Sequence, residues 1–294
     1  ERMQPADAAL RSYVPMSLLR RLAAQADGGL EASAERAAAA SLFADVSGFT
    51  ALTERLAERG PEGAEILARV LESVFGAVVD EVLVHGGDVI RFAGDAAIAV
   101  FPAPAGDLAS AVRAAAACGV AIQRALDRRE PVAGERLTAR VGIAAGDVTA
   151  SVVGGESGRW ELLVTGAPIE RMGVVCGRAV PGEVRVDARV ADALDPAGLG
   201  AVDGDTVVVR TAAAPAVVPP EPPDVRGDLL RAFVPRGIQQ RLDAGHGDWL
   251  AEFRRVTVLF AGLGGLRDAA AAERDGLRPG TRGLRTEVQR VSRR

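Results

Sequence analysis

Two apolar segments that each lead into an aspartate constrain the fold of this chain most. The first, residues 41–44, leads into Asp45 and a glycine-containing turn, and the second, residues 89–92, leads through Gly94 into Asp95. The first pattern predicts a buried strand that enters a turn and a helix, and the second predicts a tight hairpin with Asp95 at its tip. Carboxylates in such positions are suitable ligands for hard divalent cations such as Mg²⁺.

The amino-acid composition limits the classes of protein to which the chain can belong. The chain has 294 residues, 48% of them apolar, so it can bury one full domain and part of another. Its 39 acidic and 35 basic residues leave a net charge of −4, which argues against a nucleic-acid-binding protein. We find no apolar stretch of the roughly 18 residues that span a bilayer and no signal peptide, so we expect a cytoplasmic protein without membrane contact.

Cysteine and histidine are too scarce for a disulfide framework or a histidine-rich metal site. The chain contains Cys118, Cys176, His85 and His246. We interpret all four as structural or surface residues, with His85 at the end of a helix beside a glycine cap.

Five motifs occur in an order that resembles the class III adenylyl/guanylyl cyclase catalytic domain, in particular its soluble, bicarbonate-responsive type and bacterial relatives. They are Asp45-Val46-Ser47-Gly48-Phe49-Thr50, Phe92-Ala93-Gly94-Asp95-Ala96, Arg140-Val141-Gly142-Ile143-Ala144-Ala145-Gly146, Val164-Thr165-Gly166 and Pro181-Gly182-Glu183-Val184. The resemblance covers roughly residues 36–212.

The periodicity of this region predicts an α+β fold. We expect a strand over 38–46, a helix over 61–84 with an apolar face at spacing four, and a hairpin of strands 89–92 and 96–101. Asp107 should cap a second helix that runs to about Arg128, and residues 138–146 and 150–154 should form two more strands. This order is that of a ferredoxin-like βαββαβ sandwich.

An internal repeat organises the rest of the chain. Arg11-Ser12-Tyr13-Val14-Pro15 and Arg21-Leu22 recur as Arg231-Ala232-Phe233-Val234-Pro235 and Arg241-Leu242. After the second copy, residues 255–265 repeat the segment around Asp45, with Gly262 in the place of the aspartate. We therefore expect a helical lead-in over 1–35, the cyclase-like domain over 36–212, a proline-rich linker over 213–228 and a truncated second cyclase-like unit over 229–294, in a fragment of a longer tandem protein.

The resemblance implies a site that binds two Mg²⁺ or Mn²⁺ ions and a nucleotide. Asp45 and Asp95 would hold the metals together with the backbone carbonyl of Val46. The phosphate contacts would come from a helix N-terminus and one basic side chain, namely Ser47, Gly48, Phe49, Thr50 and Arg140. The implied reaction converts ATP, favoured over GTP, into cyclic AMP and pyrophosphate by attack of the 3′-hydroxyl on the α-phosphorus.

Simpler interpretations remain open for these residues. Asp45 could cap the following helix, Asp95 could be an ordinary turn residue, and Arg140 could be a solvated arginine at a strand end. Gly86-Gly87-Asp88 also suggests a diguanylate cyclase, but that signature continues with an acid and a phenylalanine, whereas Val89-Ile90 follow here.

The chain departs from the family in its basic and amide residues. All 35 basic residues are arginine, and asparagine is absent. In the family a lysine reads the adenine, and an asparagine and an arginine four residues later orient the ribose and stabilise the transition state; Glu170 and Val174 occupy the last two places here. Arg91 replaces a lysine of the soluble relatives and is a candidate anion or base contact, although the arginine that completes their bicarbonate pocket falls at Gly173.

These departures predict the metal-donating half of an adenylate cyclase. A second cyclase domain, in cis or in trans, would supply the missing groups, and the chain alone should be nearly inactive because one lost transition-state donor costs about 10²- to 10³-fold in rate. The alternative is a catalytically degenerate module that binds nucleotide or a partner and regulates attached domains. A diguanylate cyclase or polymerase-like enzyme on the same fold is a third hypothesis, and it would yield a dinucleotide.

Overall fold

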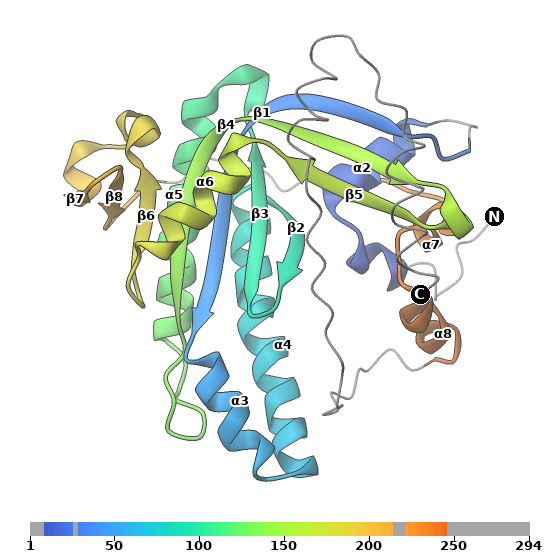
Figure 1. Ribbon diagram of the computed structural model, residues 1–294, viewed down its shortest axis with the longest axis horizontal. Coiled ribbons are helices and arrows are strands. Elements are labelled where there is room, and N and C mark those ends of the chain that lie inside the picture. The colour runs from blue at the N-terminus through green and yellow to red at the C-terminus, as the bar shows by residue number, and fades with distance from the viewer. Residues whose placement is uncertain (1–8, 26–28, 214–220, 246–294) are drawn as a thin grey trace, which may run out of the picture. The chain divides into compact units, whose positions relative to one another are not determined.

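A mixed sheet forms the centre of the protein. The computed structural model describes residues 9–25, 29–213 and 221–245. The sheet has the strand order β2-β3-β1-β4-β6-β8-β7, and β5 pairs with β4 outside this order (Figure 1). The strands are β1 (Ser33–Ser47), β2 (Asp88–Ala93), β3 (Ala96–Pro102), β4 (Thr138–Gly154), β5 (Trp160–Thr165), β6 (Val184–Asp187), β7 (Leu199–Asp203) and β8 (Thr206–Val209). The α-helices are α2 (Met16–Ala24), α3 (Phe49–Ala57), α4 (Pro61–Val84), α5 (Leu108–Asp127), α6 (Ala167–Gly177), α7 (Gly227–Arg231) and α8 (Arg236–Asp243).

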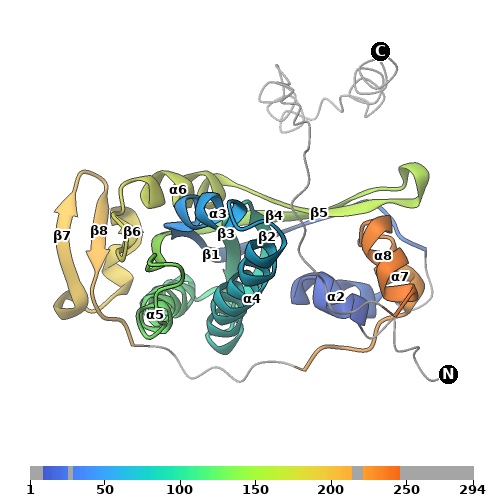
Figure 2. The same ribbon diagram turned by 90° about the horizontal axis from the view of Figure 1, so that it is seen from below.

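The predicted ferredoxin-like sandwich is confirmed. Strand β1 is followed by α3 and α4, then by the β2–β3 hairpin, α5 and β4. Strand β1 lies between β3 and β4 and is antiparallel to both. Helices α4 and α5 cover one face of the sheet, and α6 packs on the other (Figure 2). The predicted second unit lies mostly outside the described residues.

Helix α4 has the bounds that the sequence predicts. Val70, Val74, Val78 and Val82 are buried at spacing four, so this face joins the core against the sheet. Pro61 begins the helix, and His85 ends it as the C-cap, immediately before Gly86 at φ +79°.

Helix α5 approaches the sheet closely because small residues line its buried face. Asp107 caps it as predicted, accepting a hydrogen bond of 3.0 Å from the Ser110 amide. A Cβ on Gly119 would lie 3.0 Å from a Val184 methyl group, so this position has no room for a larger side chain. Cys118 is buried in the same core, which agrees with its predicted structural role.

Two strand predictions are wrong in extent. Strand β1 begins at Ser33 and not at 38, and the two strands predicted over 138–146 and 150–154 are one continuous strand, β4. The sequence at Gly146-Asp147 suggested a break. Pairing with β1 as far as Val152, and with β5 from Thr149 onward, keeps the segment extended instead.

The antiparallel pairing gives the sheet two ends that differ in structure. The end of β1, the tip of the β2–β3 hairpin and the beginning of β4 meet at one end (Figure 1). At the other end, α2, α7 and α8 form an apolar cluster with β4 and β5. Among the described residues, none of the helices has the length and apolar character needed to cross a membrane.

Candidate active site

Asp45 lies near the end of β1, directly opposite Arg140 of β4. The Arg140 guanidinium donates a hydrogen bond to the Asp45 carboxylate and forms an ion pair with it. The Asp45 side chain is 18% exposed and that of Arg140 is 39% exposed, so the pair opens to solvent at the sheet end. The interpretation of Asp45 as a helix N-cap is wrong, because Gly48 is the N-cap of α3 and no side chain caps that helix.

Asp95 reaches the same place from the β2–β3 hairpin. Gly94 takes a φ of +66°, which allows the tight turn, and Asp95 follows it half-buried. The Val46 amide donates a hydrogen bond of 3.0 Å to the Asp95 carbonyl oxygen. Backbone groups of one strand residue point to the same side, so those of Val46 face the hairpin tip rather than β4. The two aspartates and the Val46 backbone therefore meet at one sheet end.

The N-terminus of α3 lies directly after the end of β1. Gly48, at φ +90°, turns the chain from β1 into α3, whose first residues are Phe49 and Thr50. The Leu52 amide bonds to the Gly48 carbonyl oxygen at 3.1 Å, whereas the preceding amides of the first turn receive no side-chain cap. Uncapped amides and the helix dipole favour an anion at this position.

Two polar atoms at this end are buried without a hydrogen-bond partner, the Ser47 hydroxyl oxygen and Nε of Arg140. Native proteins usually satisfy such groups, so both atoms are free to bond to a ligand at this end. Oxygen ligands from two carboxylates suit Mg²⁺ or Mn²⁺, which commonly combine one or two protein carboxylates with substrate phosphates. The residues therefore fit a metal–nucleotide complex. No cluster of three or more His, Cys, Asp or Glu side chains suited to a metal occurs within the described ranges.

Neighbouring carboxylates favour the charged form of Arg140 at this end of the sheet. The hydrogen bond to Asp45 raises the pKa of Arg140 above its ordinary value, and the negative charge of Asp95 adds to the effect. Cys176 of α6 lies behind this pair, with Sγ 3.4 Å from the Arg140 carbonyl oxygen. Burial and then the charge of Asp45 raise the pKa of the Cys176 thiol to about 11, so the thiol is neutral and structural.

Three other residues singled out in the sequence lie elsewhere. Arg91 is on β2, where its guanidinium lies 3.6 Å from the Glu161 carboxylate of β5. Glu170 and Val174 lie one helical turn apart on α6, and both are exposed. The α6 positions that resemble the nucleotide-orienting places of the family thus carry a carboxylate and an apolar side chain at the surface.

Two supports of the site were missed in the sequence. The Ser41 hydroxyl, buried within β1, lies 3.2 Å from the Ala144 carbonyl oxygen and 2.9 Å from that of Pro168, which ties β1 and β4 to α6. Arg171 of α6 bonds to the buried Asp187 carboxylate at 3.0 Å. A serine within an apolar strand is a weak signal for the Ser41 contacts, and no local sequence pattern predicts the contact of Arg171 with Asp187.

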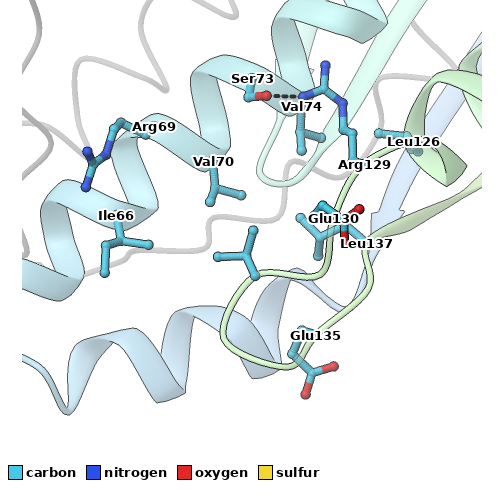
Figure 3. Close-up of a pocket in the computed structure, with 11 residues that line it drawn as sticks. Ile66, Arg69, Val70, Ser73, Val74, Leu126, Arg129, Glu130, Glu135 and Leu137 are labelled. Carbon is cyan, nitrogen blue, oxygen red and sulfur yellow. Dashed lines mark hydrogen bonds between the residues drawn. The ribbon is translucent and has the colours of Figure 1, made fainter.

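A separate cavity of about 410 Å³ lies between α4 and the segment from the end of α5 to β4 (Figure 3). Val70, Val74 and Leu126 give it an apolar base, and Arg129, which bonds to Ser73, lies at its rim. Neither Asp45 nor Asp95 lines it. The cavity is therefore distinct from the candidate active site.

Comparison with known proteins identifies the family. The model of the adenylate and guanylate cyclase catalytic domain matches residues 32–216. The chain belongs to this family and carries a cyclase catalytic domain.

Individual relatives agree with this assignment. The mouse protein "Adenylate cyclase type 10" is 34% identical over 125 residues, which cover 42% of this chain and only 8% of that protein. A Mycobacterium tuberculosis protein, Rv1319c, is 35% identical over 138 residues, or 47% of this chain and 24% of its own length.

Solved structures extend the likeness to the fold. The guanylyl cyclase Cya2 has a TM-score of 0.50 at 28% identity, covering 62% of this chain and 95% of Cya2. A bacterial light-regulated adenylyl cyclase has a TM-score of 0.53 at 19% identity, covering 80% of this chain and 64% of that one, and it supports the fold alone.

Proposed function

We propose that this chain is the metal-donating half of an adenylate cyclase, which converts ATP into cyclic AMP and pyrophosphate together with a second cyclase domain. The observation that carries the proposal is the meeting of Asp45, Asp95 and Arg140 at one sheet end, beside an uncapped helix N-terminus. The adenylate cyclase type 10 relatives favour ATP over GTP as the substrate.

The chemistry requires only positioning and charge. The 3′-hydroxyl of the nucleotide loses its proton to solvent water and attacks the α-phosphorus, a new P–O bond closes the ring, and the bond to the leaving pyrophosphate breaks. Two bound Mg²⁺ or Mn²⁺ ions would lower the pKa of the hydroxyl and offset charge on the triphosphate. In this proposal Asp45, Asp95 and the Val46 carbonyl hold the metals.

Phosphate binding falls to the residues after β1 and to Arg140. The Ser47 hydroxyl and the backbone amides of Gly48, Phe49 and Thr50 would donate to phosphate oxygens. Arg140 pairs with Asp45, and its unpaired Nε is available as a further donor. The guanidinium would then shift part of its hydrogen bonding from a carboxylate to a phosphate, both of which match its planar fork.

A second candidate function is a catalytically degenerate module that binds nucleotide or a partner and regulates attached domains. Glu170 and Val174 favour it, because neither side chain can replace an asparagine or an arginine toward the ribose and the phosphates. The retention of two aspartates at one sheet end favours the enzyme half, since a pure interaction module has no need of both.

Calorimetric titration with a non-hydrolysable ATP analogue and Mn²⁺ tests the proposal. We expect metal-dependent binding by the chain and none by the Asp45→Asn, Asp95→Asn double variant. Asp147→Asn is the matched control, because Asp147 pairs with Arg36 across the same two strands but both side chains are more than half exposed. Binding that persists in the double variant, or that is absent from the folded wild type, would contradict the half-site.

A further inference from the structure

The internal repeat has a structural counterpart outside residues 32–216, which match the cyclase domain model. The first copy is defined here as residues 10–22 and the second copy as residues 230–242. Leucine, arginine, valine and proline recur at matched places, and Tyr13 of the first copy corresponds to Phe233 of the second. Both copies lie beside the β4–β5 ribbon, defined as residues 149–154 and 160–165, in the two views of the molecule (Figures 1 and 2).

The two copies share their local conformation. Pro15 is the N-cap of α2 with φ −57° and ψ 146°, and Pro235 is the N-cap of α8 with φ −56° and ψ 138°. The residue before each proline closes the same turn, since Val14 donates to the Arg11 carbonyl oxygen and Val234 to that of Arg231. The two copies of the repeat therefore adopt the same local structure.

Two matched positions are buried in both copies, and they are buried together, although α2 has three further buried residues and α8 has none. Leu10 and Leu230 are both 0% exposed, and Val14 and Val234 are 7% and 2% exposed. All four belong to one apolar cluster, to which the ribbon contributes Val152. Helices of the length of α2 and α8 are marginal in water by themselves, so each copy depends on this packing for its structure.

Hydrogen bonds hold the first copy against β2 and the second copy against β5. Both oxygens of the buried Asp88 carboxylate accept hydrogen bonds from the first copy, at 2.8 Å from the Met16 amide and 2.7 Å from that of Ser17. The Trp160 amide at the start of β5 donates to the Ala232 carbonyl oxygen of the second copy at 3.0 Å. The ribbon and the first copy thus form a surface that is completed by the second.

We propose that the two copies form a homotypic pairing module. In this module the first copy and the β4–β5 ribbon present a surface for another lead-in segment of the same sequence type, and the chain supplies that segment from its own second copy. The pairing holds the second copy against the ribbon and the first copy. The module is independent of nucleotide chemistry and does not rest on the proposed function.

Amide hydrogen exchange of the full chain tests mutual dependence. We expect Leu230→Asp to accelerate exchange at least about tenfold in both α2 and α8, since burying a charge in the cluster opens it, and to leave β1 and α5 unchanged. Leu163→Asp is the matched control, because Leu163 lies on the same ribbon but is 39% exposed. Unchanged protection of α2 in Leu230→Asp would refute the pairing, because the ribbon alone would then hold the first copy.

A sequence exchange tests whether the pairing is homotypic, and it avoids the charged variant. In one chimera the sequence of residues 10–22 replaces residues 230–242, and in the other a scrambled sequence of the same composition replaces them. We expect the first chimera to keep the protection of α2 and the scrambled one to lose it. Equal loss in both chimeras would show that the surface recognises only the second copy and would overturn the proposal.

Discussion

The two ends of the β1–β4 strand pair differ in the groups that surround their polar atoms. At the Asp45 end, the Ser47 hydroxyl and Arg140 Nε are buried without partners, and α3 begins without a side-chain cap. At the far end, Asp88 accepts two amide hydrogen bonds and the apolar cluster is closed. Arg11 Nε and the Gln25 side-chain oxygen are also buried without partners at the far end, so the two ends differ in their carboxylates, in the start of α3 and in apolar packing. Substitutions should therefore alter ligand binding at the first end and stability at the second.

The largest effect is expected when α6 of one chain supplies nucleotide-orienting groups to the Asp45 end of a second chain. Glu170→Asn with Val174→Arg would place an amide and a guanidinium on the exposed face of α6, one turn apart. If two chains associate as cyclase domains do in the proposed function, the rate of cyclic nucleotide formation should rise about 10²- to 10³-fold, because each site gains transition-state donors. Product formation from ATP and Mn²⁺ measures this.

The single variants are the controls for that gain. Each should give less than the double variant, since the two groups act on different parts of the nucleotide. A double variant that folds and binds nucleotide but forms no more product than the parent would favour the degenerate module.

The next effect concerns the contact that holds α6 against the sheet. A Cβ on Gly142 of β4 would lie 2.3 Å from both the Cys176 amide nitrogen and the Met172 carbonyl oxygen of α6, and backbone atoms cannot turn aside. Gly142→Ala should lower the free energy of unfolding by about 3 kcal/mol in urea titrations. The matched change Gly76→Ala, within α4 and with no atom near the added Cβ, should raise it by about 0.5 kcal/mol.

Helix α4 and the contact at Gly142 show which features of the fold could be predicted from the sequence and which could not. The bounds of α4 were predictable because Pro61, the spacing of its valines and Gly86 are all local signals. The close approach at Gly142 was not, because it depends on how α6 packs across the sheet. The continuity of β4 was missed for the same reason, since its two pairing partners lie far away in the sequence.

The candidate site also has features that could be predicted from the sequence and features that could not. The aspartates and the glycine turns were visible as motifs, but the pairing of Asp45 with Arg140 follows from strand register over 95 residues of separation. The repeat was likewise visible, and the burial of its two copies in one cluster was not.

A third prediction concerns acid stability at Asp187 of β6. Burial opposes ionisation of this carboxyl, but hydrogen bonds from Arg189 and Arg171 outweigh it and lower its pKa to about 2. A lowered folded-state pKa adds stability that is complete above the unfolded value near 4 and is lost as the pH falls toward 2. The contribution is about 2 kcal/mol.

Urea unfolding between pH 5 and pH 2 should therefore show a steep loss in the wild type that Asp187→Asn reduces, while carboxyls such as Asp205, whose pKa is also lowered, account for the remaining loss. Asp192→Asn, at an exposed position of the following turn, should leave the wild-type slope intact. Equal slopes in wild type and Asp187→Asn would mean that the arginine contacts do not persist in solution.

At the far end, Asp88→Asn should cost about 1 to 2 kcal/mol of unfolding free energy. The charge-assisted caps on the Met16 and Ser17 amides become weaker, and one amide loses its acceptor to an NH₂ group. Hydrogen exchange in α2 should accelerate while the affinity for the ATP analogue stays unchanged. An equal loss of nucleotide affinity would contradict the functional separation of the two ends.

The smallest effect on stability, and the sharpest test of the comparison, comes from Arg140→Gln. The ion pair with Asp45 is partly exposed, so its loss should change the free energy of unfolding by less than about 1 kcal/mol. The affinity for the metal–nucleotide complex should nevertheless fall about tenfold, because a charged phosphate donor is replaced by a neutral amide. Arg36→Gln, which breaks the exposed pair with Asp147 on the same two strands, should change neither quantity. If Arg140→Gln instead binds the complex as tightly as the wild type, Arg140 serves only to neutralise Asp45, and the phosphates must be bound by the Ser47 hydroxyl and the amides at the start of α3.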